Sequence, residues 1–84
     1  MKTPRDISGR QLGKLLSKFG YRYVSHVGSH MRYVTYSNGE HYVTIPDHSN
    51  LRIGTLDSII RLVADHLEIS KESVVESLSR KRVD

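Results

Sequence analysis

Cysteine is absent from this chain of 84 residues. Its absence excludes a disulfide framework, a thiolate metal site and a cysteine nucleophile. Long apolar runs are also missing: the N-terminal segment lacks the apolar stretch of a secretory signal, and no segment approaches the roughly 20 apolar residues that span a bilayer. We therefore expect a cytoplasmic protein without a membrane partner.

The chain is long enough for one domain, over residues 1–84, with one modest core. A large enclosed substrate cavity does not fit a domain of this size. Thirteen Lys and Arg against nine Asp and Glu give a formal charge of +4, which suits a polyanionic partner. The positive charge gathers in the N-terminal half, at Lys2, Arg5, Arg10, Lys14, Lys18 and Arg22. Within this set we take Lys14 as a candidate phosphate contact.

The first helix is expected over residues 9–19. Ser8 followed by Gln11 is typical of a capping box, apolar residues then recur at helical spacing, and Gly20 is a common stop signal. Gly13 lies inside this helix and lowers its stability by about 1 kcal/mol relative to alanine. The sequence leaves open whether the helix tolerates that loss or another segment packs closely there.

Three strands in a meander should follow, because β-branched and aromatic residues dominate residues 21–27, 30–36 and 41–45 and turn residues separate them. A loop over residues 46–54 leads to a second helix capped by Thr55, and Ser70 caps a third helix that ends near residue 80. Residues 81–84 look frayed. The fold class is therefore α+β, in the order αβββαα.

The register of the second hairpin is predicted from Asn38-Gly39, which favours a two-residue turn. This turn pairs Val34 with Val43 and turns both, together with Ile45, towards the helices. The face left to solvent then carries Met31, Tyr33, Thr35, Tyr42 and Thr44.

The tripeptide Gly28-Ser29-His30 is the strongest candidate for chemistry. Neutral imidazole accepts a proton near pH 7, so His30 at the start of a strand can act as a general base on a phosphodiester. Gly28 provides the turn geometry, and Ser29 either orients the imidazole or contacts phosphate. The predicted register places His30 opposite Asp47, at the rim of the helix-covered side of the sheet.

A phosphate site is expected at the start of the second helix. Gly54 and Thr55 supply unpaired backbone N–H groups there, and Arg52 supplies charge. His48, in the preceding loop, should lie close to His30, and it is equally consistent with a phosphate contact and with a surface residue.

The other histidines favour simpler interpretations. Taken singly, His30 is as consistent with a hydrogen-bonded structural residue as with a catalyst. His26, His41 and His66 are interpreted as surface residues. A zinc site built from His26, His30, His41 and His48 fits no compact ligand spacing, so we predict neither a metal nor another cofactor.

Together these residues resemble the HicA family of toxin ribonucleases. The resemblance covers roughly residues 8–79 and rests on motifs in order along the chain, namely Leu15-Leu16, Phe19-Gly20-Tyr21, Gly28-Ser29-His30, Tyr33, Val43-Thr44-Ile45-Pro46, His48, Leu51, Gly54-Thr55-Leu56 and Ile69-Ser70-Lys71-Glu72. The sequence departs from the family at Met31, where a polar residue or histidine is frequent, and in having Arg52 as the only cation of the loop before Gly54.

The resemblance implies a fold similar to a double-stranded-RNA-binding domain, with helices on one side of a three-stranded antiparallel sheet. It also implies an endoribonuclease that cleaves mRNA and inhibits translation, with His30 as the catalytic residue and a HicB-type antitoxin as protein partner. We expect a monomer or weak dimer. A non-catalytic RNA-binding module and a protein-interaction domain remain alternatives on the sequence alone.

Overall fold

A computed structural model describes residues 6–80 of the chain. Its elements follow the order α1 (Gly9–Leu16), the short 3-10 helix η1 (Ser17–Phe19), β1 (Arg22–Val27), β2 (His30–Thr35), β3 (His41–Pro46), α2 (Ile53–Leu67) and α3 (Lys71–Arg80). This confirms the predicted αβββαα order. Lys2, Arg5 and the expected fraying of residues 81–84 lie outside the described part of the chain.

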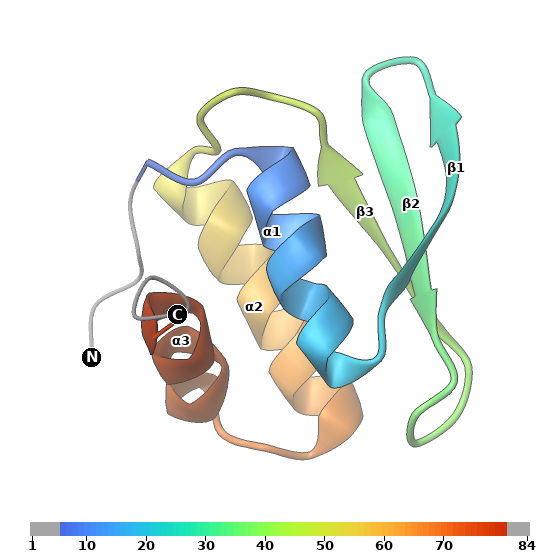
Figure 1. Cartoon of the computed structure of the whole chain (residues 1–84). Coiled ribbons are helices and arrows are strands. Elements are labelled where there is room, and N and C mark those ends of the chain that lie inside the picture. Colours follow the sequence, from blue (N-terminus) through green and yellow to red (C-terminus); the bar gives the residue numbers. More distant parts are fainter. Residues whose placement is uncertain (1–5, 81–84) are drawn as a thin grey trace.

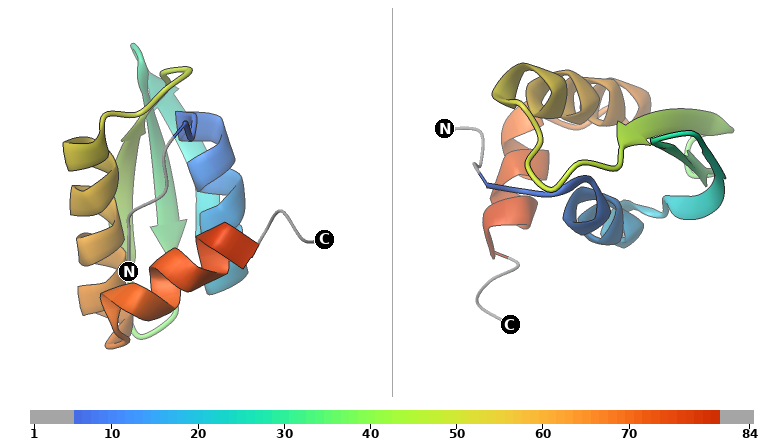
Figure 2. Two further views of the ribbon diagram at one scale, coloured as in Figure 1. Left: turned by 90° about the vertical axis from the view of Figure 1, so that its left-hand side faces the viewer. Right: turned by 90° about the horizontal axis from the view of Figure 1, so that it is seen from above.

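The three strands form one antiparallel sheet in the order β1-β2-β3. Helices α1 and α2 lie side by side on one face of it, and α3 packs across α2 and α1 on their far side (Figures 1 and 2). The other face of the sheet carries no helix in the described residues. The molecule therefore has a helix layer and a sheet layer, with the core between them.

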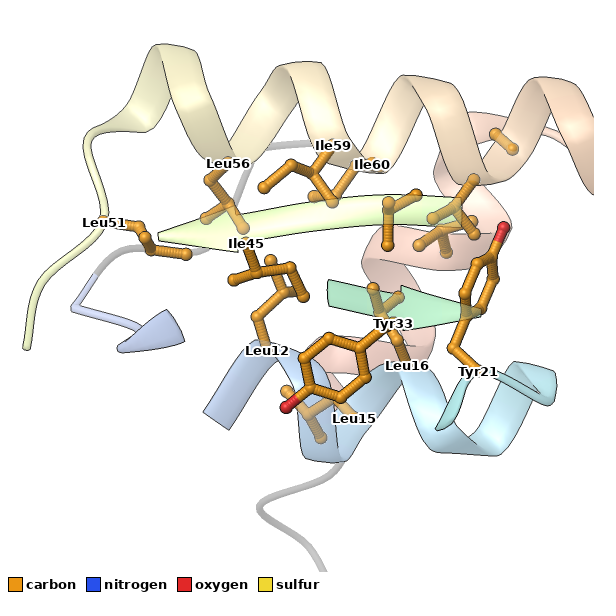
Figure 3. Close-up of a cluster of buried hydrophobic side chains, with 14 of the residues drawn as sticks. Leu12, Leu15, Leu16, Tyr21, Tyr33, Ile45, Leu51, Leu56, Ile59 and Ile60 are labelled. Carbon is orange, nitrogen blue, oxygen red and sulfur yellow. The ribbon is translucent and has the colours of Figure 1, made fainter. Parts of the chain in front are cut away.

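The core lies between α1 and α2 and the inner face of the sheet, and α3 adds Val74 and Val75 to it from the far side of the two helices (Figure 3). Each fully buried aliphatic side chain contributes about 1.5–3 kcal/mol to folding. The largest apolar side chains that are fully buried are Leu12, Leu16, Tyr21, Ile45, Leu56, Ile60, Val63, Val74 and Val75.

The predicted caps of the first and third helices are confirmed. Ser8 Oγ accepts from the Gln11 amide at 3.0 Å, and Gln11 Oε1 accepts from the Ser8 amide at 2.9 Å, which completes the capping box. Gly20 follows Phe19 in the left-handed conformation, with φ 92°. Ser70 Oγ accepts from the Ser73 amide at 3.1 Å.

The predicted register between β2 and β3 is wrong by one residue. Tyr33 pairs with Val43, and Val34 pairs with Tyr42, because the connection over residues 36–40 is longer than a two-residue turn. Asn38 and Gly39 both adopt positive φ within it. A shift of one residue reverses the faces of a strand, and here the strand reversed is β2.

As a consequence, Met31, Tyr33 and Thr35 are buried on the helix side instead of being exposed. Val34 leaves the helix side for the opposite face. Val43 and Ile45 are buried against the helices as predicted, and Tyr42 and Thr44 are exposed as predicted.

Gly13 is explained by the position of Tyr33. A Cβ built on Gly13 would lie 2.1 Å from the Tyr33 hydroxyl oxygen and 2.8 Å from the ring atom Cε2. The ring of Tyr33 therefore occupies the space that any larger residue would need. Close packing, the alternative left open by the sequence, is the reason for a glycine in this helix.

The end of α2 is tied to the hairpin between β2 and β3. His66 Nε2 donates to the carbonyl oxygens of Ser37 and Gly39, at 2.9 Å each. The His66 ring stacks on His41, with centroids 4.2 Å apart. His41 and His66 are half-buried and packed together, so the prediction that they are simple surface residues is wrong.

His41 also meets the hydroxyl group of Tyr21, at 2.8 Å from Nδ1. Burial raises the pKa of Tyr21 to about 12, so its hydroxyl is neutral and donates to a neutral His41. Burial, with a smaller effect of the His66 charge, lowers the pKa of His41. If His41 were protonated, its Nδ1 could no longer accept the hydrogen bond from the Tyr21 hydroxyl group.

We predict that Gly13→Ala lowers the free energy of unfolding by about 1–2 kcal/mol, because overpacking against Tyr33 outweighs the gain in helix propensity. Gly54→Ala is the matched control, since no atom lies within 4 Å of an added Cβ there, and it should leave stability unchanged or raise it by up to about 1 kcal/mol. Urea unfolding followed by circular dichroism measures both. Equal stability of the two variants would contradict the packing explanation.

We predict that the chain loses stability as the pH falls below about 6.5, the usual histidine value. The folded state holds His41 with a lowered pKa, so the unfolded state binds protons first and stability declines towards the folded-state pKa. His41→Gln keeps an acceptor for Tyr21 but does not titrate, and its urea midpoint should change less between pH 7 and pH 5. Parallel curves for the two proteins would rule out this role of His41.

Candidate functional site

The turn between β1 and β2 presents His30 as the first residue of β2. Gly28 adopts φ 59°, in the left-handed region, and no atom lies within 4 Å of a Cβ built there, so the conformation alone favours glycine. His30 pairs with Val27 on one side and Pro46 on the other. The Ser29 carbonyl accepts from the Asp47 amide at 2.7 Å, which ties the turn to the chain after β3.

The face on which His30 lies differs from the prediction. His30 is exposed and alternates with the buried Met31, so it lies on the helix-free face instead of the rim of the helix-covered side. It stands opposite Pro46 and not Asp47. The one-residue register shift described above accounts for both differences.

The loop over residues 46–52 is fixed by the start of α1. The Gly9 amide donates to the His48 carbonyl at 2.9 Å, and the Leu51 amide donates to the Ile7 carbonyl at 2.8 Å. A Cβ on Gly9 would lie 1.9 Å from the Pro46 carbonyl oxygen, so only glycine allows the backbones this close. The loop therefore has a fixed position next to the turn that holds His30.

Asp47 is the charged centre of this loop. Arg10 donates to both of its carboxylate oxygens, from Nε and Nη2 at 3.1 Å each, and His26 Nε2 lies 3.6 Å from Oδ2. The hydrogen bonds from Arg10 lower the pKa of the Asp47 carboxyl, so it is charged at neutral pH. Sequence analysis noted Arg10 only as part of a basic helix and missed this pairing, because no local signal links residues 37 positions apart.

The start of α2 differs from the prediction. The helix begins at Ile53 with Arg52 as its N-cap, and Thr55 lies inside the first turn instead of capping it. The Leu56 amide is the first to find a partner, the Arg52 carbonyl at 2.9 Å. The expected group of Arg52, Gly54 and Thr55 is thus at the helix N-terminus, with space around Gly54.

The candidate residues form two groups. Gly28, Ser29 and His30 lie at the β1–β2 turn, with the exposed His48 in the loop that Ser29 contacts through Asp47. Residues 52–55 lie at the same end of the molecule, but the start of α1 and the end of β3 stand between the two groups (Figure 1). Lys14 is exposed farther along α1.

The histidines considered for zinc do not meet. His41 begins β3, whereas His30 pairs with the residue that ends this strand. Within residues 6–80, His, Cys, Asp and Glu side chains form no group of three or more arranged to hold a metal ion. None of the helices in the same part of the chain combines the length and apolar character needed to cross a bilayer.

A family model described as the HicA toxin of bacterial toxin-antitoxin systems matches residues 9–63. The match spans α1, the whole sheet and most of α2, and it includes the β1–β2 turn and the start of α2. The match places the chain in the class of toxins that belong to toxin-antitoxin pairs. The chain belongs to the HicA toxin family.

Membership of this family supports a general nuclease role, a nucleic-acid target and an antitoxin partner. No curated protein and no solved structure matches the chain. The roles of individual residues therefore have to be argued from their positions in this structure.

We predict that Gly28→Val lowers the free energy of unfolding by about 1–2 kcal/mol, because a β-branched residue is strained at positive φ. Gly28→Asn, which tolerates the left-handed region, should lose less than half as much. Thermal unfolding of the two variants beside the parent measures the difference. If valine and asparagine are tolerated equally, the turn does not hold the conformation described.

Proposed function

We propose that this chain is a toxin endoribonuclease that cleaves mRNA and thereby inhibits translation, with His30 as the general base. It acts in the cytoplasm, where mRNA is translated, and a HicB-type antitoxin that covers His30 restrains it. The reaction needs no metal or other cofactor in this mechanism, since the nucleophile belongs to the RNA.

The observation that carries the proposal is the position of His30. Its side chain is exposed, while its backbone is held between two strands and behind a turn that Asp47 fixes. A base held in this way meets substrate without a large loss of conformational freedom. The same residue belongs to the Gly28-Ser29-His30 tripeptide, inside the region that matches the toxin family.

In the reaction, His30 removes the proton of a 2′-hydroxyl group, whose oxygen attacks the adjacent phosphorus. The bond to the 5′-oxygen breaks, that oxygen takes a proton from water, and the hydroxide left behind takes the proton from His30. The products are a 2′,3′-cyclic phosphate and a 5′-hydroxyl end. General-base catalysis contributes about 10² to 10⁴ in rate, and positioning and electrostatic stabilisation supply the remainder.

Phosphate groups along the RNA are bound by the remaining candidates. Gly28 and Ser29 shape the turn beside the scissile phosphate, and His48 lies in the neighbouring loop. The amides at Gly54 and Thr55, with the charge of Arg52, attract phosphate at the helix N-terminus. Lys14 adds a positive charge on the α1 side.

We predict that the purified chain cleaves single-stranded RNA in EDTA and that His30→Ala lowers the rate by about 10² to 10⁴ while remaining folded. Expression of the parent, but not of this variant, should arrest cell growth. Gel analysis of the products should show cyclic phosphate ends, and RNA with 2′-O-methyl groups should resist cleavage.

The control for this experiment is His26→Ala. His26 pairs with the buried Met31 and is in contact range of Asp47, so its side chain lies on the α1 side of the sheet. Its removal should change the rate by no more than a few-fold. Cleavage by His30→Ala at the parental rate would disprove the assignment of the base, and the absence of cleavage by the parent would disprove the enzyme.

A further inference from the structure

The helix-free side of the sheet, here called the open face, is a surface of basic and aromatic residues. Alternation along the strands and the observed pairing assign to it Arg22, Ser25, Val27, His30, Arg32, Val34, Tyr42 and Thr44. No helix covers it in the described part of the chain (Figure 2). His30 therefore shares one surface with the residues considered next.

At the centre of the open face, Arg32 and Tyr42 form a platform. The Arg32 guanidinium carbon lies 4.8 Å from the centroid of the Tyr42 ring. Val34, on the same face, is only 6% exposed although it lies outside the core cluster. Since no helix covers Val34, neighbouring side chains of the open face must lie across it.

The charge of the sheet has one sign. The segments β1, β2 and β3 contain Arg22 and Arg32 but no aspartate or glutamate. Glu40, just before β3, borders the platform and forms a hydrogen bond with Tyr42 that raises the pKa of the tyrosine. An anionic partner thus meets two guanidinium groups beside an aromatic ring.

We propose that the open face binds single-stranded RNA, with an unpaired base stacked on the Arg32–Tyr42 platform and an adjacent phosphate presented to His30. This inference rests on the proposed function and adds to it the strand state of the substrate. His30 and Arg32 are two residues apart on one strand, about 7 Å, a distance that one nucleotide of an extended RNA bridges.

Stacking selects unpaired RNA for a simple reason. In a duplex the faces of the bases are already stacked on one another, so an aromatic side chain binds only bases that are splayed out. The candidate phosphate contacts at Lys14 and at the start of α2 lie on the other side of the sheet and bind a different part of the RNA. The segment that is cut crosses the open face.

In the test every protein carries His30→Ala, so that RNA binding is measured without cleavage. Fluorescence anisotropy gives the affinity for an unstructured oligoribonucleotide of about 12 nucleotides and for a duplex of the same sequence. Tyr42→Leu should weaken single-strand binding about tenfold or more, and Tyr42→Phe, which keeps the ring, should restore most of it. Arg32→Gln should weaken binding and lower the salt slope by about one.

Matched controls lie on other surfaces. Tyr23→Leu removes an exposed tyrosine whose edge contacts Tyr33, on the α1 side, and Arg61→Gln removes an exposed arginine paired with Asp57 on α2. Each should change the affinity less than twofold. Circular dichroism confirms that every variant is folded.

Any of four results would overturn the inference: unchanged affinity in Tyr42→Leu and Arg32→Gln, equal losses in the controls, no binding at low salt, or stronger binding of the duplex. Cleavage by the unmodified chain is assayed in parallel. If Tyr42→Leu and Arg32→Gln weaken RNA binding but the unmodified chain does not cleave RNA, the proposed function is refuted and the inference stands. If the unmodified chain cleaves RNA but neither substitution weakens binding, the inference is refuted and the proposed function stands.

Discussion

The close approach of α1 to the end of β3 determines the arrangement around His30. At Gly9 the backbone of the helix reaches the Pro46 carbonyl more closely than any side chain would allow, and the Gly9 amide bonds to His48. The ion pair between Arg10 and Asp47 holds the next part of the same loop. Asp47 in turn bonds to Ser29, so the helix positions the turn in front of His30 through one connected set of contacts.

The opposite end of the sheet is held by different chemistry. There His66 bonds to the hairpin carbonyls and stacks on His41, which meets the buried Tyr21. These contacts join α2 to the far end of β3 without involving the candidate active site. Imidazole side chains thus hold one end of the sheet, and close backbone packing with an ion pair holds the other.

Local signals in the sequence located most of the fold. The caps at Ser8 and Ser70 depend on residues within one helical turn, so the sequence was enough to place them. The register of β2 was missed because it depends on how residues 36–40 fold and on the room that Gly13 leaves for Tyr33. The motif made His30 a candidate, but the face on which His30 lies depends on that register. The pairing of Arg10 with Asp47 could be found only in the folded chain.

Strand β1 lies at an edge of the sheet, and its pairing with β2 is interrupted by a bulge between Tyr23 and Ser25. A bulge bends an edge strand and breaks the regular row of amides and carbonyls that another strand needs for pairing. A regular edge would otherwise allow a strand of another molecule to pair with β1, edge to edge. The irregularity at Val24 thus disfavours pairing of β1 with a strand of another molecule.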